Sequence, residues 1–308
     1  MKKKIMLLCL VALLSLAALA GCGKEEAQEE ATAGENMIAQ AIENTEKVAS
    51  GTYDMTMDMA MSITVDGQQQ DLNMTSTGNV QYIAEPMTMA LTMNMDMGEL
   101  GSQETQGYGE VVDDDFLLYN SVDVDGNTTW YKQNMGSAAE MQQYNAASNM
   151  DIYLNSMKNF TEEGVEQVNG SEATKFTGVI NGDDLQAAID GMAGLSDQLS
   201  GLGLDEDTLS SLYADAGDLN ISLWIDNKSV LPVKYEMDMT QLMQNIMTKL
   251  LEGTEGIDMT YEISNMFMSM TVTGYDNVDS IDIPEEARNA QDLTALTEDG
   301  ADAATEGE

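Results

Sequence analysis

The chain has 308 residues and is strongly acidic, with 54 Asp and Glu against 12 Lys and Arg and a net charge of −42. This charge argues against nucleic acid as a partner, because phosphate binding needs clusters of Lys and Arg. The sequence contains no histidine, which excludes a His-based catalytic triad, a histidine general base and a His-ligated zinc site.

The N-terminal region has the parts of a lipoprotein signal peptide. Lys2–Lys4 form a positive segment, Ile5–Ala20 form a short apolar segment, and Leu19-Ala20-Gly21-Cys22 matches the lipobox of bacterial lipoprotein precursors. The apolar segment runs into small residues rather than a stop-transfer cluster, so we expect cleavage and not a membrane span. The match implies a diacylglyceryl group on Cys22, and we expect anchoring at the outer face of the cell membrane.

The rest of the chain divides by composition. Residues 1–21 are the expected signal peptide, and residues 22–34 are the lipidated cysteine and a flexible tether rich in Glu, Gln, Ala and Thr. Residues 35–288 are expected to form one domain, and residues 289–308 an acidic disordered tail. Cys9 leaves with the signal peptide, so no disulfide is expected.

The domain begins with an expected amphipathic helix. Glu35–Ser50 carries Met37, Ile38 and Ala41 at helical spacing, and Gly51 is expected to end the helix. Later helical patterns occur at Ala138–Phe160, twice within Asp183–Ala216, and at Gln241–Leu251.

Three long alternating segments follow the first helix. From Tyr53 to Val65 every odd position is apolar, and this period of two predicts a half-buried strand. Asp66-Gly67 is a turn, after which Leu72–Tyr82 alternate on even positions. Beyond Pro86, Met87–Met97 alternate again.

Shorter strands complete the pattern. Asn169-Gly170 predicts one tight hairpin, and a change of parity at Ser264-Asn265 predicts a β-bulge in the last strand. The expected shorter strands are Thr105–Val112, Asp115–Asn120, Thr128–Gln133, Val165–Val168, Ala173–Ile180, Ile221–Ile225, Val233–Asp238, Ile257–Ile263 and Met266–Val272.

These elements predict an α+β fold. About eleven strands, mostly joined by short turns, favour one strongly curved antiparallel sheet, a half-barrel with helices packed on its concave face. The expected helices are too few to cover the whole apolar face of the long strands, so we expect a groove on that face.

At this point the sequence resembles the LolA/LolB-like fold, and in particular LppX/LprG-type and Gram-positive lipoproteins. The matching segments are Val168–Phe176 (VNGSEATKF), Leu223–Asn227 (LWIDN) and Leu231–Lys234 (LPVK), together with the order of the elements over about residues 35–286. The resemblance implies an eleven-stranded half-barrel closed by helices around an apolar cavity that can hold acyl chains. It implies no individual ligand residues.

Methionine is the unusual residue of this chain, with 26 copies concentrated on the alternating strands. Three hypotheses stand: ordinary core packing, a pliable cavity wall for flexible ligands, and capture of a soft metal such as Cu(I) by Met-x-Met pairs. On the second hypothesis, the candidate cavity-lining residues are Met55, Met57, Met59, Met61, Met87, Met89, Leu91, Met93, Met95, Met259, Met268 and Met270.

Other candidate sites have simpler explanations. Asp113-Asp114-Asp115 and the Asp123–Asn127 segment are interpreted as hairpin turns, with weak calcium binding as the alternative. The second segment lacks the closing glutamate of an EF-hand loop. Trp130, Tyr131 and Trp224 are core residues or an aromatic shelf for a ligand.

The sequence as a whole predicts a membrane-anchored extracytoplasmic lipoprotein that binds a lipid or another elongated hydrophobic ligand. It is expected to be a monomer and not an enzyme, with no cofactor and no resident metal. Two alternatives remain: a structural or signalling surface lipoprotein that acts through protein contacts without a ligand, and soft-metal binding by methionine.

Overall fold

The computed structural model describes residues 33–65, 67–98, 101–124, 127–141, 158–180, 217–252 and 259–292. The chain divides into two units, Met1–Thr32 and Ala33–Glu308, and every described element belongs to the second. No helix in these described ranges is long and apolar enough to cross a membrane.

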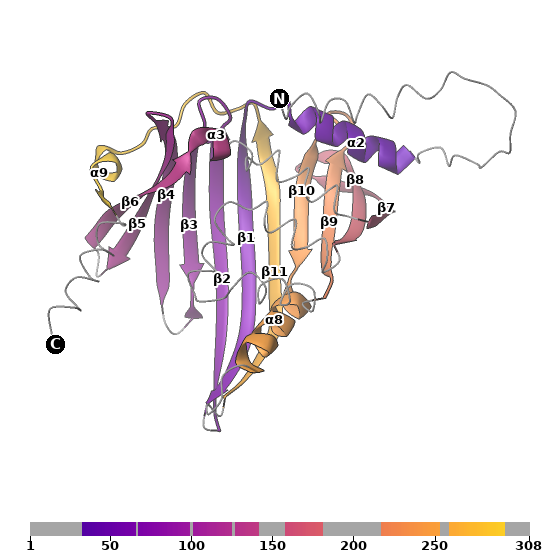
Figure 1. Cartoon of the computed structure of the whole chain (residues 1–308). Helices are drawn as coiled ribbons and strands as arrows, with labels where there is room; N and C mark the ends of the chain where they lie inside the picture. The colour runs from indigo at the N-terminus through magenta and orange to yellow at the C-terminus, as the bar shows by residue number, and fades with distance from the viewer. Residues whose placement is uncertain are drawn as a thin grey trace, which may run out of the picture. The chain divides into compact units, whose positions relative to one another are not determined.

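Twelve strands form a single sheet in the second unit, with four described helices (Figure 1). The helices are α2 (Ala33–Thr45), α3 (Ala138–Met141), α8 (Thr240–Glu252) and α9 (Glu285–Arg288). The strands are β1 (Ser50–Val65), β2 (Gln68–Ile83), β3 (Thr88–Asp96), β4 (Ser102–Val112), β5 (Asp115–Val124), β6 (Asn127–Ser137), β7 (Lys158–Val168), β8 (Ser171–Ile180), β9 (Leu219–Asp226), β10 (Pro232–Asp238), β11 (Met259–Tyr275) and β12 (Gln291–Asp292).

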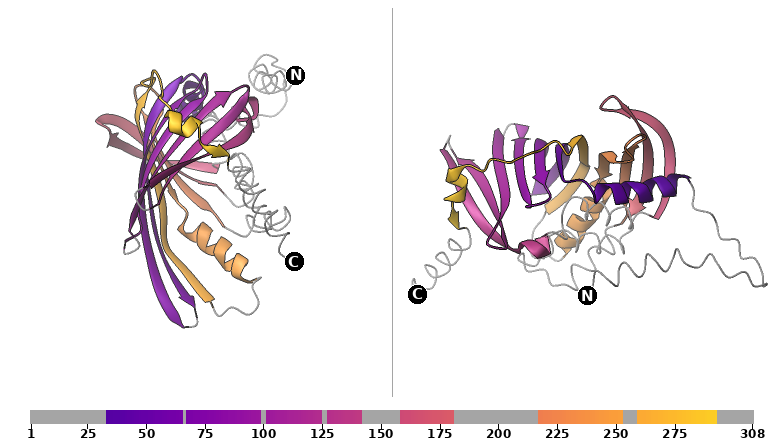
Figure 2. Two further views of the ribbon diagram at one scale, coloured as in Figure 1. Left: turned by 90° about the vertical axis from the view of Figure 1, so that its left-hand side faces the viewer. Right: turned by 90° about the horizontal axis from the view of Figure 1, so that it is seen from above.

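The sheet consists of two antiparallel meanders joined in the middle. Its order is β12-β6-β5-β4-β3-β2-β1-β11-β10-β9-β8-β7, so β1 to β6 form one meander and β7 to β11 the other. The join is the long antiparallel pair of β1 and β11. Only the two-residue strand β12 adds a parallel pairing among the described strands. The sheet is strongly curved and open, which confirms the predicted half-barrel (Figure 2).

Alternating side chains place one apolar face and one polar face on the long strands. Residues directly opposite one another in an antiparallel pair point to the same face. Met59 lies opposite Met266 on β11 and Met74 on β2, so apolar odd positions of β1 meet apolar positions of both neighbours. The register of β1 and β11 shifts between Ala60 and Met61, opposite Ser264, which confirms the predicted bulge.

Helices α2 and α8 pack on the hollow side of the sheet (Figure 2). Ile38 and Ala41 of α2 and Leu242 of α8 share one hydrophobic core with strand residues that point to the same side. The strand residues of this core are Tyr53, Phe176, Ile180, Leu219, Ile221, Leu223, Ile225, Tyr235, Met237 and Val272.

The C-terminal segment packs on the opposite face. Ile283 and Ala287 share a small hydrophobic core with Tyr119 of β5. Tyr119 pairs with Tyr108 of β4, and Tyr108 pairs with Ala90 of β3, which points to the face opposite to the hollow side. Past the expected domain boundary at residue 288, β12 pairs with β6, so residues 289–292 belong to the fold. The remainder of the expected tail, residues 293–308, lies outside the described residues.

Three sequence predictions need correction or fall outside the described ranges. The first helix ends at Thr45 rather than Ser50, and Gly51 lies inside β1, where Tyr82 of the neighbouring strand leaves no room for a Cβ. Residues 158–160 were expected in a helix but begin β7, because strand pairing with β8 overrides their helical spacing. The expected helices of Asp183–Ala216 lie outside the described residues.

Candidate functional site

Methionines from five neighbouring strands form one continuous face, named here the methionine face. Met57 lies opposite Met268, which lies opposite Met237; on its other side Met57 lies opposite Ser76, and Ser76 opposite Met95. The next row joins Tyr235, Met270, Met55, Gly78 and Met93 in the same way. This face therefore crosses β10, β11, β1, β2 and β3, including the join between the two meanders.

Ten of the twelve predicted lining residues lie on the methionine face. They are Met55, Met57, Met59, Met61, Met89, Leu91, Met93, Met95, Met268 and Met270. Met87 lies in the turn before β3, and Met259 lies opposite Val65 in the register.

Sequence reasoning missed further members of the same face. Met74 and Met266 lie opposite Met59, and Met237 lies opposite Met268. For Met74 and Met266 the parity of the strand alternation was a sufficient signal. For Met237 it was not, because the pairing of β10 with β11 cannot be read from either strand alone.

The methionine face is only half-buried. The methionines of β1, β3 and β11 that lie on it have intermediate exposure, whereas the core residues beside α2 are buried. On the opposite face of the same strands, polar side chains pair across the sheet: Asn79 donates to Asp54 at 2.8 Å and Thr75 donates to Asp58 at 3.0 Å. The sheet thus has a solvated polar face and an apolar face that its described neighbours cover in part.

No charged residue occurs at the described positions of the methionine face on β1, β2, β3, β10 and β11. One end of the face meets a cluster of tyrosines, in which the rings of Tyr53 and Tyr82 stack at 5.6 Å and that of Tyr275 lies edge-on to Tyr53 at 6.5 Å. Burial raises the pKa of Tyr53 and Tyr235, with a further contribution from neighbouring tyrosines, so these hydroxyls stay neutral. The site is apolar and uncharged.

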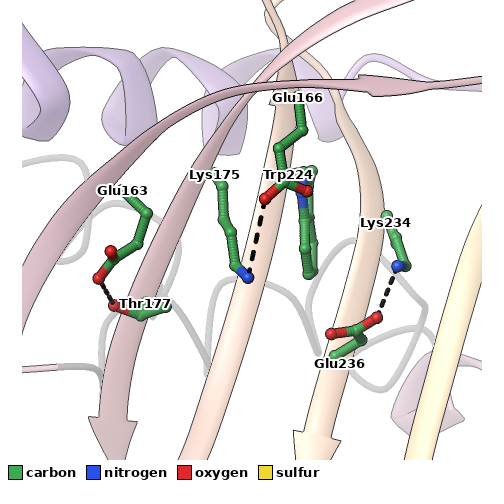
Figure 3. Close-up of polar contacts among 7 residues, drawn as sticks. All are labelled: Glu163, Glu166, Lys175, Thr177, Trp224, Lys234 and Glu236. Carbon is green, nitrogen blue, oxygen red and sulfur yellow. Dashed lines mark hydrogen bonds and ion pairs between the residues drawn. The ribbon is translucent and has the colours of Figure 1, made fainter. Parts of the chain in front are cut away.

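Trp224 belongs to a structural cluster on the other face of the sheet (Figure 3). Its ring is 2 % exposed and lies between Lys175 and Lys234, whose Nζ atoms are 4.7 and 4.5 Å from the ring centroid. Its Nε1 donates to Glu166 Oε2 at 2.8 Å, and Glu236 pairs with Lys234. Trp224 is no part of a ligand shelf on the methionine face, because its register with Lys234 and Thr271 places it on the opposite face.

The segments that carried the sequence resemblance meet in this cluster. Lys175 comes from the VNGSEATKF segment, Trp224 from LWIDN and Lys234 from LPVK. Asn169, in the turn of the first segment, donates to the carbonyl of Val272 at 2.7 Å. These residues thus mark how β8, β9 and β10 pack against one another.

The first acidic segment is a turn, as predicted, and the described residues of the second are the strand ends Asp123 and Val124 of β5 and Asn127 of β6. Asp113 and Asp114 have positive φ angles of 49° and 74° in the turn between β4 and β5, and residues 125–126 lie outside the described ranges. Within the described residues, no group of three or more Asp, Glu or Cys could hold a metal ion, and the sequence has no His. The soft-metal hypothesis for methionine stays a hypothesis.

Comparisons with known proteins give one family and several similar folds. Residues 33–292 match the family described as "Family of unknown function (DUF6612)". No curated protein matches the sequence.

Similar solved structures include two mycobacterial proteins, the first of them a lipoprotein. LppX of Mycobacterium tuberculosis has 14 % identity and a TM-score of 0.39, covering 80 % of this chain and 97 % of its own. LprF of Mycobacterium bovis has 12 % identity and a TM-score of 0.39, covering 82 % and 96 %. A LolA superfamily protein of Nitrosomonas europaea has 8 % identity and a TM-score of 0.19, covering 83 % and 97 %. These likenesses concern the fold alone.

Proposed function

We propose that the chain, which belongs to the family of unknown function DUF6612, is a membrane-anchored extracytoplasmic protein that binds an elongated apolar molecule on the methionine face. The observation that carries the proposal is this face itself: methionines of neighbouring strands form one continuous, uncharged and half-exposed apolar surface. An exposed apolar area of this kind marks an interaction site, because each Å² removed from water contributes about 25 cal/mol.

Methionine suits a flexible ligand. Its side chain is unbranched, has several rotatable bonds and carries a polarisable sulfur, so a methionine surface adapts to chains of different shape. Ordinary core packing would bury these residues, as it buries Leu223 and Ile225 beside α2, yet the methionines of β1 and β3 keep intermediate exposure.

The test places a charge on the methionine face. Met57→Lys puts an ammonium group at the centre of the proposed binding surface, and desolvating it opposes the binding of an apolar molecule. We expect the affinity for the neutral apolar dye N-phenyl-1-naphthylamine, measured by its fluorescence with residues 23–308, to fall about tenfold or more. That stretch keeps every described contact.

Thr56→Lys is the matched control, because Thr56 is the next residue on β1 and points to the polar face. Its affinity for the dye should equal that of the original chain. Met93→Lys, on β3, is a second variant on the methionine face and guards against a local folding defect at Met57. Equal dye affinity in all four proteins, each folded by circular dichroism, would refute binding on this face.

Membrane anchoring through Cys22 is the second part of the proposal, and its support is the lipobox alone. In cells grown with radiolabelled palmitate, we expect the original chain to carry label and Cys22→Ala to carry none. Cys9→Ala is the matched control, since Cys9 is the only other cysteine of the chain. Label that persists in Cys22→Ala would contradict the anchor.

A further inference from the structure

One polar atom on the methionine face lacks a partner. Ser76 lies in the middle of its row, directly opposite Met57 on one side and Met95 on the other. It is 2 % exposed, and its Oγ is the only buried side-chain oxygen or nitrogen of the described residues without a hydrogen-bond partner. Buried hydroxyl groups are normally paired, so an unpaired one inside an apolar surface calls for an explanation.

Small residues of β2 lie at the same place. Ser76 and Gly78 are consecutive positions of β2 on the methionine face. A Cβ built on Gly78 would lie 3.1 Å from the carbonyl oxygen of Thr92, 3.6 Å from Met55 Cε and 3.8 Å from Leu91 Cδ1, so side chains of the same face cover this position. The end of a methionine side chain changes rotamer readily, so a ligand chain can replace this cover and reach the floor of the face.

We propose that the ligand is an acyl ester, and that the Ser76 hydroxyl donates a hydrogen bond to its uncharged carbonyl oxygen. This inference rests on the proposed function. A plain hydrocarbon would leave Ser76 Oγ without a hydrogen bond, so the unfavourable free energy of burying that hydroxyl would remain in the complex. A free fatty acid would bring a carboxylate to a face whose described positions carry no Lys or Arg, and a buried charge without a partner is unfavourable.

The experiment compares three probes of similar size that differ only in the oxygen they offer. Methyl dodecanoate is a neutral ester, pentadecane has no oxygen, and dodecanoate is charged at neutral pH. Each displaces N-phenyl-1-naphthylamine from residues 23–308. We expect dodecanoate to bind more weakly than methyl dodecanoate, because its carboxylate must leave water without a cationic partner. Pentadecane is the reference without oxygen, against which the effect of the Ser76 hydroxyl on the ester is measured.

Ser76→Ala isolates the hydroxyl. This variant should lose about tenfold in affinity for methyl dodecanoate and keep its affinity for pentadecane. Its thermal unfolding midpoint without ligand should be equal to or above that of the original chain, because it removes an unpaired buried hydroxyl. Ser269→Ala is the matched control, a serine of the same sheet that lies opposite Thr56 on the polar face, and it should change neither affinity.

Failure of this inference can be told from failure of the proposed function. If none of the probes binds the original chain, both are overturned. If Ser76→Ala leaves the ratio of the affinities for methyl dodecanoate and pentadecane unchanged, the role of Ser76 is overturned and binding on the methionine face stands. A lower unfolding midpoint of Ser76→Ala would show that the fold itself uses the hydroxyl, which also overturns the inference.

Discussion

At the scale of single residues, Glu110 holds the C-terminal segment to the polar face of the sheet. Arg288 of α9 donates to both carboxylate oxygens, through Nε at 2.8 Å and a second guanidinium nitrogen at 2.9 Å, and Tyr119 donates at 3.1 Å. The hydrogen bonds from Arg288 hold the pKa of Glu110 below its ordinary value of 4.5. Burial and the neighbouring carboxylate raise the pKa of Tyr119 to about 12.

This contact predicts a pH dependence of stability. The pKa of Glu110 is lower in the folded protein than in the unfolded chain. Its contribution to the free energy of unfolding is therefore complete at a pH above the ordinary pKa and is lost as the pH falls through the folded pKa. At pH 7, Glu110→Gln should lower the free energy of unfolding by about 1 kcal/mol, a modest value because Arg288 is half-exposed. In urea unfolding, the difference from the original chain should shrink as the pH falls below 4.5.

Glu104→Gln is the control for this prediction. Glu104 is exposed on the same strand and the same face as Glu110, and its replacement should change the unfolding free energy by less than about 0.5 kcal/mol. A difference between Glu110→Gln and the original chain that stays constant from pH 7 to pH 3 would contradict the assignment.

At the scale of elements, α8 continues the hydrogen bonding along the edge of β11 beyond the point where β10 ends. The ladder of β10 and β11 ends at the pair of Asp238 and Phe267. Beyond it, the backbone N–H of Met266 donates to Thr240 Oγ1 at 2.9 Å, and that of Ile263 donates to Gln244 Oε1 at 2.6 Å. Side chains of α8 thus accept hydrogen bonds from backbone N–H groups of β11 on either side of the bulge that interrupts its pairing with β1.

Gln244→Ala should therefore weaken the protein although it removes no apolar contact. The N–H of Ile263 would lose its acceptor in a partly buried place, and we expect the unfolding free energy to fall by about 1–2 kcal/mol in urea unfolding. Gln241→Ala, an exposed position on the first turn of the same helix, should cost less than about 0.5 kcal/mol. Equal effects of the two substitutions would contradict the role given to Gln244.

Local pattern explains which features of these elements were predictable. The alternation of β1 and β11 identifies their apolar face, and the change of parity at Ser264 locates the bulge, because both depend on neighbouring residues alone. The docking of Gln244 on Ile263 and of Arg288 on Glu110 joins segments far apart in sequence, and no local period encodes such contacts. Ser76 interrupts the apolar pattern of β2, but its missing partner is visible only once its neighbours are placed.

At the scale of the molecule, the methionine face exists only because the two ends of the domain pair. β1 comes from its beginning and β11 from its end, and their long antiparallel ladder brings Met55 and Met57 opposite Met270 and Met268. The sequence showed the strands to be methionine-rich but not that they are neighbours, since antiparallel pairing over such a separation depends on the whole sheet. The proposed binding surface is a property of the complete sheet and not of one strand.

The most direct test of this account is native mass spectrometry of residues 23–308, exported in the source organism behind a cleavable signal peptide without a lipobox and purified without detergent. We expect a population heavier than the chain by the mass of an apolar molecule, released on collisional activation, and we expect this population to be absent from Met57→Lys but present in Thr56→Lys. A chain that carries no added mass, in a preparation that also fails to bind N-phenyl-1-naphthylamine, would contradict the claim that the methionine face holds a ligand.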